Sequence, residues 1–207
     1  MKQLPVITIS RQSGSRGREA GQLLAQALGI PCYDYEVLSR AAKESGISPA
    51  LFEQEEKAAA AMIRRLKSGQ TAQIAPASME MFEAQSKIIR DMADQGPCVI
   101  VGRCADTVLR QRENVVHVYI YASESRRIAN TMAKRHVDRR IAKVMIDRID
   151  RGRSAYHSLF SSHLWGDTSA YDLCVCTDHL TPEETAEVIR AFLQAREKDQ
   201  SGNGNPL

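Results

Sequence analysis

The chain has 207 residues, a formal net charge of +3, and a composition that is 43% hydrophobic and 26% charged. These values are typical of a soluble globular protein and suffice for one compact domain with a hydrophobic core. A transmembrane protein is excluded, because no apolar run approaches the roughly 20 residues that span a bilayer. The opening segment MKQLPVITIS is too short and strand-like for a signal peptide, so we expect a cytoplasmic location with no membrane partner.

Four short β-rich runs recur along the chain, at residues 4–9, 98–102, 115–121 and 171–176, with helical stretches between them. A shorter fifth strand is added at residues 30–34. Three of them are nearly continuous apolar runs, which is typical of strands covered on both faces. Strands separated by helices indicate a parallel sheet with right-handed crossovers. We therefore predict an α/β fold with a parallel sheet of about five strands, in a single domain that spans residues 1–207.

Cap signals predict where helices begin and end. A helix at residues 18–28 ends where Gly29 stands in the position of a C′ glycine. Residues 181–184 form a capping box with proline at N1, which opens the last helix. The tail, residues 198–207, is expected to be disordered.

Two helical excursions interrupt the alternation of strands and helices. The first spans about residues 35–95: a Ser-Pro pair at 48–49 opens one helix, residues 68–78 are predicted to be a loop, and a second helix runs over 79–95. The second excursion spans about residues 135–165. Both are best explained as helical arms inserted into one α/β domain.

Positive charge is concentrated in one segment of this nearly neutral chain. Residues 126–153 hold ten Lys or Arg against three Asp, a local charge of +7, so the remainder sums to −4 (3 − 7). Such a segment indicates a polyanionic partner, either nucleic acid or a nucleotide. It contains no aromatic residue, which argues against a stacking platform for single strands. A solvated helix face is the alternative explanation.

The turn after the first strand has the layout of a phosphate-binding loop. Residues 10–17, SRQSGSRG, lead from an apolar strand into a helix whose first N–H groups can surround an anion. Gly14 and Gly17 allow the positive φ angles and close approach that such a loop needs. The usual pattern GxxxxGK[ST] is not met, since its lysine and its hydroxyl residue are missing. An ordinary strand-to-helix turn therefore stays open as an alternative.

Five short motifs occur in an order and spacing that together indicate one family: ISRQSGSRGREAG, GIPCYDYEVLSRAA, CVIVGRCADTVL, VYIYASESRR and WGDTSAYDLCVCT. With them the chain resembles the cytidylate kinase-like proteins, relatives of bacterial cytidylate kinase among the P-loop nucleoside monophosphate kinases, from about Ile7 to the final helix. The resemblance implies a P-loop three-layer α/β/α sandwich with helical monophosphate-binding and lid insertions. It also implies a nucleoside triphosphate donor, a monophosphate acceptor such as CMP, and Mg²⁺.

The resemblance assigns the donor phosphates to the loop and the start of its helix. Aligned without gaps on the GSGKGT of ordinary cytidylate kinases, Gly17 falls on the lysine and Glu19 on the threonine that normally binds Mg²⁺. The cytidylate kinase-like branch commonly reads GSGGRE, so the missing lysine is a feature of the branch, whereas Arg16 replaces a glycine. The expected ATP phosphate-binding residues are Ser13, Gly14, Ser15, Arg16, Gly17, Arg18 and Glu19.

Arg18 is the predicted substitute for the lysine, because a guanidinium is permanently charged and can bind two phosphate oxygens at once. Its alternative role is that of a solvated first-turn residue. Glu19 is the candidate Mg²⁺ ligand, directly or through water. It suits equally well the role of a first-turn acid that stabilises the helix dipole.

The acceptor is expected near the strands at 30–34 and 98–102. CYDYEVLSRAA resembles the family segment LLDSGAIYR, which implies a ribose or base contact for Asp34 and an acceptor-phosphate contact for Arg40. VGRCAD resembles DGRDxG, which implies a substrate contact for Arg103; Cys104 stands in the position of the acid, and Asp106 is expected to compensate. An N-cap role is the alternative for Asp34. The predicted acceptor-binding residues are Asp34, Arg40, Arg103, Asp106 and Asp172.

Three arginines in DRIDRGRSAYH resemble the arginine-rich lid that closes over the donor phosphates in monophosphate kinases. Arg148 and Arg151 would share one helix face, and with Arg153 and Arg18 they are the predicted catalytic residues. Phosphoryl transfer requires mainly positioning and positive charge around the moving group. A surface helix of mixed charge is the alternative.

The resulting prediction is a kinase that transfers the γ-phosphoryl group of ATP, with Mg²⁺, to CMP or dCMP. Nucleotide substrates, rather than nucleic acid or membranes, are the expected partners. A nucleotide-binding regulatory protein that has lost transfer activity and a kinase of another small-molecule acceptor stay open, as does a nucleic-acid-binding module.

Overall fold

Five parallel strands form one sheet in the computed structural model of this chain, which describes residues 4–34 and 76–202. The order is β2-β3-β1-β4-β5, so β1 is central. In register, Ile9 of β1 pairs with Val101 on one side and Val118 on the other. The strands are β1 Val6–Arg11, β2 Cys32–Tyr33, β3 Val99–Val101, β4 Val115–Tyr121 and β5 Leu173–Cys176. The predicted parallel sheet of five strands is confirmed.

The helices follow the predicted order, with two differences at their ends. Those described are α1 Gly17–Leu28, α4 Pro76–Asp94, α5 Ala105–Val108, α6 Glu124–Arg135, α7 Arg139–Phe160, α8 Pro182–Gly202 and a 3₁₀ turn, η1, at Thr168–Ala170. α4 begins at Pro76, inside the segment predicted to be a loop. α8 continues through Gly202, so the first five residues of the expected disordered tail are helical. The helix predicted to begin at 48–49 lies outside the described residues.

Two helix ends have the predicted caps. Gly29 ends α1 with a φ of 65°, and its N–H donates to the carbonyl oxygens of Ala25 and Gln26. At α8, the N–H of Thr181 donates to Glu184 Oε2 at 2.7 Å, and the N–H of Glu184 donates to Thr181 Oγ1 at 3.2 Å. These reciprocal bonds form a capping box, which satisfies donors that the helix itself leaves unpaired.

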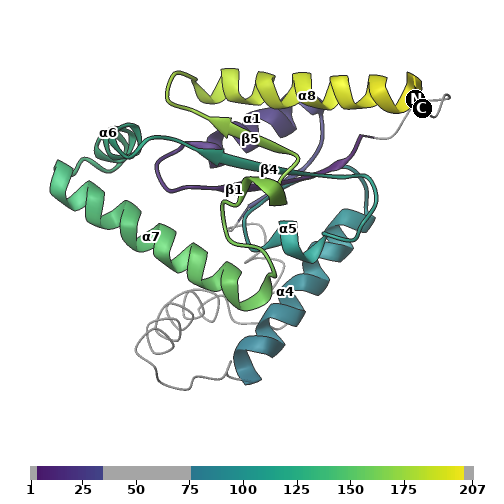
Figure 1. Ribbon diagram of the computed structural model, residues 1–207, viewed down its shortest axis with the longest axis horizontal. Helices are drawn as coiled ribbons and strands as arrows, with labels where there is room; N and C mark the ends of the chain where they lie inside the picture. The colour runs from purple at the N-terminus through teal and green to yellow at the C-terminus, as the bar shows by residue number, and fades with distance from the viewer. Residues whose placement is uncertain (1–3, 35–75, 203–207) are drawn as a thin grey trace.

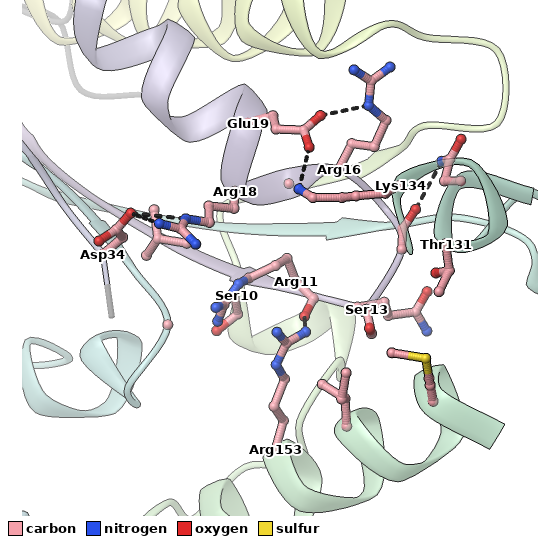
Figure 2. Close-up of a pocket in the computed structure, with 18 of the residues that line it drawn as sticks. Ser10, Arg11, Ser13, Arg16, Arg18, Glu19, Asp34, Thr131, Lys134 and Arg153 are labelled. Carbon is pink, nitrogen blue, oxygen red and sulfur yellow. Dashed lines mark hydrogen bonds and ion pairs between the residues drawn. The ribbon is translucent and has the colours of Figure 1, made fainter. Parts of the chain in front are cut away.

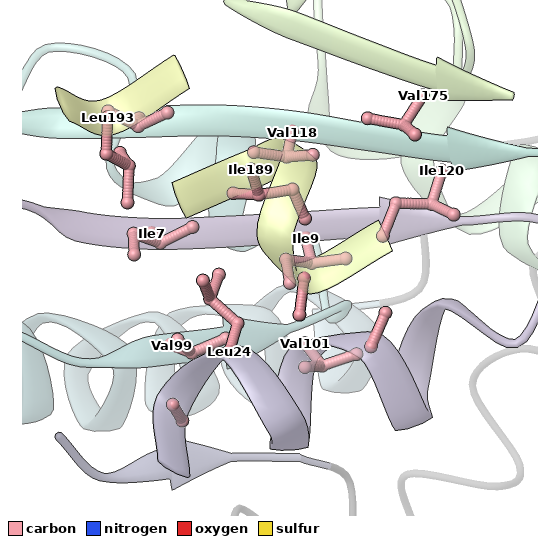
Figure 3. Close-up of a cluster of buried hydrophobic side chains, with 14 residues drawn as sticks. Ile7, Ile9, Leu24, Val99, Val101, Val118, Ile120, Val175, Ile189 and Leu193 are labelled. Carbon is pink, nitrogen blue, oxygen red and sulfur yellow. The ribbon is translucent and has the colours of Figure 1, made fainter. Parts of the chain in front are cut away.

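Apolar side chains that alternate along β1 enter two separate core layers. Ile9 packs with Leu24 of α1 and Ile189 of α8 on one face (Figure 3). Val6 packs with Ile89 of α4 on the other face. Figure 1 shows α1 and α8 on one side of the sheet and α4 and α5 on the other. Helices therefore cover both faces of the sheet, in a three-layer α/β/α arrangement. Burying each of these apolar side chains stabilises the fold by about 1.5–3 kcal/mol.

The carboxyl ends of the parallel strands meet at one edge of the sheet, which is where ligands bind in open α/β sheets. The loop from β1 into α1 lies at this edge, and α7 passes beside it (Figure 1). In the part of the chain that the structure describes, no helix combines the length and the hydropathy needed to cross a membrane.

Candidate active site

A cavity of about 780 Å³ opens at the carboxyl edge of the sheet, between the loop after β1, the start of α1 and helices α6 and α7 (Figure 2). Among the described residues, seven cationic and two carboxylate side chains line it, a net lining charge of +5 (7 − 2). Such an excess of positive charge attracts a polyanion. The charged lining residues are Arg11, Arg16, Arg18, Arg103, Lys134, Arg135, Arg153, Glu19 and Asp34.

Buried polar contacts hold the loop after β1 in shape. Ser15 is fully buried: its Oγ donates to the carbonyl oxygen of Gln12 at 2.8 Å, and its own carbonyl oxygen accepts from Thr177 Oγ1 at 3.0 Å. The Ser15 side chain therefore shapes the loop and does not line the cavity. Gly14 has a φ of 81°, and a Cβ there would lie 2.5 Å from the carbonyl oxygen of Arg127. Glycine is required at this position, as the sequence predicts.

Arg16, just before α1, adopts a left-handed conformation with a φ of 61°. For a residue with a Cβ this costs about 1–2 kcal/mol. Its Nε donates to Glu19 Oε2, and Lys134 Nζ donates to Glu19 Oε1, both at 2.7 Å. Burial alone would raise the pKa of Glu19, but the hydrogen bonds and charges of Lys134 and Arg16 outweigh it and hold that pKa below its ordinary value. Glu19 is thus ionised and bound by two cations.

Arg18 and Asp34, predicted for the donor and the acceptor side respectively, bind each other. Arg18 Nε and Nη2 lie 2.9 and 2.7 Å from Asp34 Oδ2, and Gln22 Nε2 donates to the same oxygen at 3.2 Å. Asp34 is only 5% exposed, whereas the Arg18 side chain is 40% exposed. Because a buried carboxylate needs such partners, this ion pair fixes the first turn of α1 to the end of β2. Arg18 is therefore held by an ion pair while part of its side chain stays exposed to solvent.

The turn after β3 holds Arg103 in a strained conformation at the cavity. Gly102, Arg103 and Cys104 all have positive φ angles, of 83°, 60° and 53°. Two consecutive left-handed residues with side chains cost of the order of 1–2 kcal/mol each, and such strain is found mainly at functional sites. The buried Gln85 of α4 stabilises the turn by donating to the carbonyl oxygen of Arg103 at 3.0 Å. Arg40 lies outside the described residues.

Helix α7 presents to the cavity a face that differs from the predicted one. Met145, Ile149 and Arg153 line the cavity and are spaced four residues apart, as on one side of a helix. Arg148 and Arg151 are exposed and do not line it, so two of the three predicted lid arginines lie elsewhere on the helix. Arg153 Nη1 instead donates to the carbonyl oxygen of β1's last residue at 2.9 Å (Figure 2).

A second contact ties α7 to the loop through two residues that the sequence analysis did not assign, Arg127 and Asp150. The N–H of Ser13 donates to Asp150 Oδ1 at 2.7 Å. Arg127 Nη1 donates to Asp150 Oδ2 at 2.6 Å and to the carbonyl oxygen of Ser13 at 3.2 Å. Burial raises the pKa of Asp150, and the Ser13 N–H, Arg153 and Arg127 offset this only in part. A carboxylate therefore occupies a main-chain donor of the loop that would also suit a phosphate oxygen.

The sequence profile of one family covers β1 through the residues just after β5: the cytidylate kinase-like family matches residues 6–179. The chain belongs to the cytidylate kinase-like family. No curated protein sequence matches it.

Solved structures share the fold of this cytidylate kinase-like protein. An uncharacterized protein from Eubacterium ventriosum is 23% identical over 92% of this chain and 99% of its own, with a TM-score of 0.72. A gluconokinase from Sinorhizobium meliloti is 14% identical over 99% and 100%, with a TM-score of 0.56. A shikimate kinase from Acinetobacter baumannii is 12% identical over 93% and 94%, with a TM-score of 0.53. At these identities the likeness shows the fold alone, and the predicted P-loop α/β/α fold is confirmed.

Two acids predicted to bind the acceptor lie away from the cavity of this cytidylate kinase-like chain. Asp106 is buried in α5, and its Oδ2 lies 3.1 Å from Nε2 of His157, a residue that does line the cavity. Asp172 precedes β5, and its Oδ2 accepts the N–H of His117 at 2.7 Å. The predicted direct contacts are corrected accordingly: Asp106 positions His157, and Asp172 braces β4 at the amino-terminal end of β5.

The described residues of this family member do not fit a protein-held Mg²⁺ site. They include no group of three His, Cys, Asp or Glu side chains able to hold a metal ion. Glu19, the candidate ligand, has one oxygen on Arg16 and the other on Lys134. Mg²⁺ is commonly bound through one or two carboxylates together with substrate phosphates. Any Mg²⁺ held by the described residues would therefore depend mainly on the phosphates that accompany it.

Proposed function

We propose that the protein is a phosphotransferase that moves the γ-phosphoryl group of ATP to a nucleoside monophosphate, with CMP and dCMP as the first candidates and Mg²⁺ carried by the ATP. One observation carries the proposal: the cavity with a lining charge of +5 at the ligand-binding edge of the sheet. Phosphoryl transfer needs little covalent chemistry from the protein and depends on positioned positive charge. Membership of a kinase-like family supports the same chemistry.

The donor phosphates are proposed to bind at residues 13–19, the loop and the first turn of α1. The first N–H groups of an α-helix have no acceptor within the helix, and the Arg16 side chain does not cap those of α1. Such a helix end suits an anion. Arg153 adds a positive charge to this space from α7. Because the Ser13 N–H is bonded to Asp150, a phosphate that takes this donor requires α7 to shift.

The acceptor is proposed to bind between the turn after β3 and the end of β2. Arg103 lines the cavity from the strained turn, and the pair of Arg18 and Asp34 also lines it. Arg40, which follows β2 in the sequence, remains a predicted partner of the acceptor phosphate. Donor and acceptor would then share one cavity, in which orientation accelerates transfer and exclusion of water prevents hydrolysis.

An ADP-release assay with a panel of acceptors tests this function. ATP and Mg²⁺ are supplied with each nucleoside monophosphate, and with shikimate, the ligand of one structural neighbour. We expect ADP to form only when an acceptor is present, and fastest with CMP or dCMP. Faster release with shikimate would favour another small-molecule acceptor. Absence of acceptor-dependent ADP, in a protein that ATP still stabilises against heat, would favour a regulatory nucleotide-binding role.

The two faces of α7 offer matched variants for the same assay. Arg153→Met removes a charge from the cavity lining and should lower kcat by about 10²–10³-fold, with a smaller change in KM, because charge stabilisation peaks in the transition state. The double variant Arg148→Met/Arg151→Met removes two exposed charges from the same helix and should lower kcat by less than about threefold, since exposed charges are screened. A larger loss in the double variant would instead support lid closure through the exposed arginines.

A further inference from the structure

We infer that Arg11, the last residue of β1, supplies the positive charge that the loop lysine provides in ordinary cytidylate kinases. The inference rests on the proposed function, because it concerns how the same cavity holds the donor phosphates. It replaces the sequence-based assignment of this role to Arg18. The supporting observation is that the Arg11 side chain fills the space beside two glycines, Gly17 and Gly102.

The side chain of Arg11 fills the space in which a side chain at position 17 would begin. Gly17 aligns with the missing lysine, and a Cβ there would lie 2.8 Å from Cβ and 3.3 Å from Cγ of Arg11, and 3.2 Å from Cβ of Ile120. Gly17 has no positive φ, so its backbone accepts a side chain and the obstacle is the Arg11 stem. Close-packed interiors do not admit such overlap. A lysine at 17 and an arginine at 11 are therefore alternatives in this loop.

The guanidinium of Arg11 lies against the turn after β3, the neighbouring strand. It lies against Gly102 so closely that a Cβ there would be 2.1 Å from Nη1 and 3.0 Å from Cζ of Arg11. The next residue is Arg103, and both arginines line the cavity. The head group of Arg11 thus lies between the proposed donor loop and a proposed acceptor-binding residue. Positive charge at this position is suited to a phosphoryl group in transfer.

The other cations that could replace the lysine are bound in other ways. Arg18 places both Nε and Nη2 on the buried Asp34, so its use for a phosphate would require breaking this ion pair. Lys134 is 62% exposed and binds Glu19 on the first turn of α1. Arg153 is attached to the carbonyl oxygen of Arg11 itself, so its position depends on the end of β1. Among the described residues, Arg11 combines the place of the missing side chain with a head group in the cavity.

Charge-removing variants give the first test. Arg11→Met keeps an aliphatic stem and should weaken binding of inorganic tripolyphosphate by about tenfold or more. It should also lower kcat by about 10²–10³-fold. The Tm of the ligand-free protein should change little. Arg11→Lys keeps the charge and should recover at least tenfold of the lost turnover. Arg190→Met, which breaks an exposed ion pair on α8, is the matched control and should change neither quantity.

Exchanging the two positions gives a stricter test. Gly17→Lys alone should lower Tm, because its side chain meets Arg11. Arg11→Gly/Gly17→Lys removes the Arg11 Cβ, which is the nearest obstacle, and restores a loop lysine. It should recover both Tm, relative to Gly17→Lys, and tripolyphosphate affinity, relative to Arg11→Gly. This non-additivity is expected when two side chains compete for one place.

The outcomes separate this inference from the proposed function. Binding and turnover like wild type in Arg11→Met would overturn the inference, as would a double variant that binds tripolyphosphate no better than Arg11→Gly. If wild type binds tripolyphosphate, Arg11→Met does not, and no acceptor yields ADP, then the role of Arg11 stands and the proposed transfer fails. If wild type binds no tripolyphosphate, both are overturned.

Discussion

Replacing Arg127 by methionine should destabilise the protein more than replacing its partner Asp150 by asparagine. The two side chains are 11% and 16% exposed, and Arg127 Nη1 lies 2.6 Å from Asp150 Oδ2. The pair is unequal, because burial raises the pKa of Asp150 in spite of its partners. The ionised carboxylate is therefore a net cost to the folded state, which Arg127 reduces. Removing the arginine leaves that cost in place, whereas removing the carboxylate charge takes it away.

The magnitudes follow from what each variant leaves behind. Breaking a fully buried pair by removing one partner costs about 3–5 kcal/mol. In Arg127→Met, Asp150 keeps the Ser13 N–H at 2.7 Å and Arg153 at 3.7 Å, so we expect a loss of about 2–3 kcal/mol. For a chain of this length that lowers Tm by roughly 4–12 °C. In Asp150→Asn, the amide oxygen still accepts the Ser13 N–H and Arg127 keeps the carbonyl oxygen of Ser13, but Arg127 loses its carboxylate partner. The loss should therefore be about 1–2 kcal/mol, smaller than in Arg127→Met.

Urea unfolding of the two single variants and the double variant at several pH values measures these differences. The double variant should lose less than the sum of the single losses, since it buries neither charge. Because burial raises the pKa of Asp150 above its ordinary value of 3.8, the folded protein binds this proton more tightly than the unfolded chain does. Lowering the pH towards the raised pKa protonates Asp150 and removes its buried charge. The stability that Arg127→Met loses relative to wild type should therefore shrink as pH falls from 7 towards 4.5. Equal single losses, additivity, or a deficit that grows on acidification would refute the reasoning.

Three further predictions concern backbone strain and one buried histidine. In thermal unfolding, Gly14→Ala should lose at least about 2 kcal/mol more stability than Gly29→Ala. Both glycines have a positive φ, but a Cβ at Gly14 would lie 2.5 Å from the carbonyl oxygen of Arg127, whereas a Cβ at Gly29 meets nothing within 4 Å. Arg16→Gly should be more stable than Arg16→Ala by about 1 kcal/mol, since both lose the same ion pair and only alanine keeps the left-handed strain. Burial lowers the pKa of His117 below 6.5, so on acidification the unfolded chain takes up this proton before the folded protein does. Wild type should therefore lose stability as pH falls below 6.5. In urea unfolding between pH 7.5 and 5.5, the free energy of unfolding should fall less for His117→Asn than for wild type.

The features predicted correctly are those that neighbouring residues determine. Nearly continuous apolar runs identify β1, β3 and β5, because strands covered on both faces need apolar side chains in both directions. The capping box at 181–184 and the C′ glycine at 29 each involve residues within one helical turn of each other. The positive φ of Gly14 follows from the loop pattern. In all of these cases the physical constraint lies within a few residues of the signal.

The features that were missed depend on contacts between distant parts of the chain. The hydrogen bond from Ser13 to Asp150 joins residues 137 positions apart, and no local sequence pattern indicates that either residue takes part in it. Arg18 was expected to face phosphates, but Asp34 at the end of β2 binds it once the chain is folded. Helical periodicity correctly puts Arg148 and Arg151 on one face of α7, yet periodicity cannot say which face meets the loop. That choice is made by packing, which turns Arg153 inwards instead.

Moving the positive charge out of the loop has a mechanical consequence. A loop lysine is carried by the first turn of its helix, whereas the cations proposed here come from β1, the turn after β3 and α7. Arg153 is bonded to the carbonyl oxygen of Arg11 on one side of the loop, and Asp150 holds the Ser13 N–H on the other. A phosphate that takes the Ser13 N–H must displace Asp150. Since Asp150 and Arg153 are separated by less than one helical turn of α7, the same displacement must reposition Arg153. In the proposed function, donor binding and a movement of Arg153 would then be one coupled event, so α7 would place its charge differently once a triphosphate is bound.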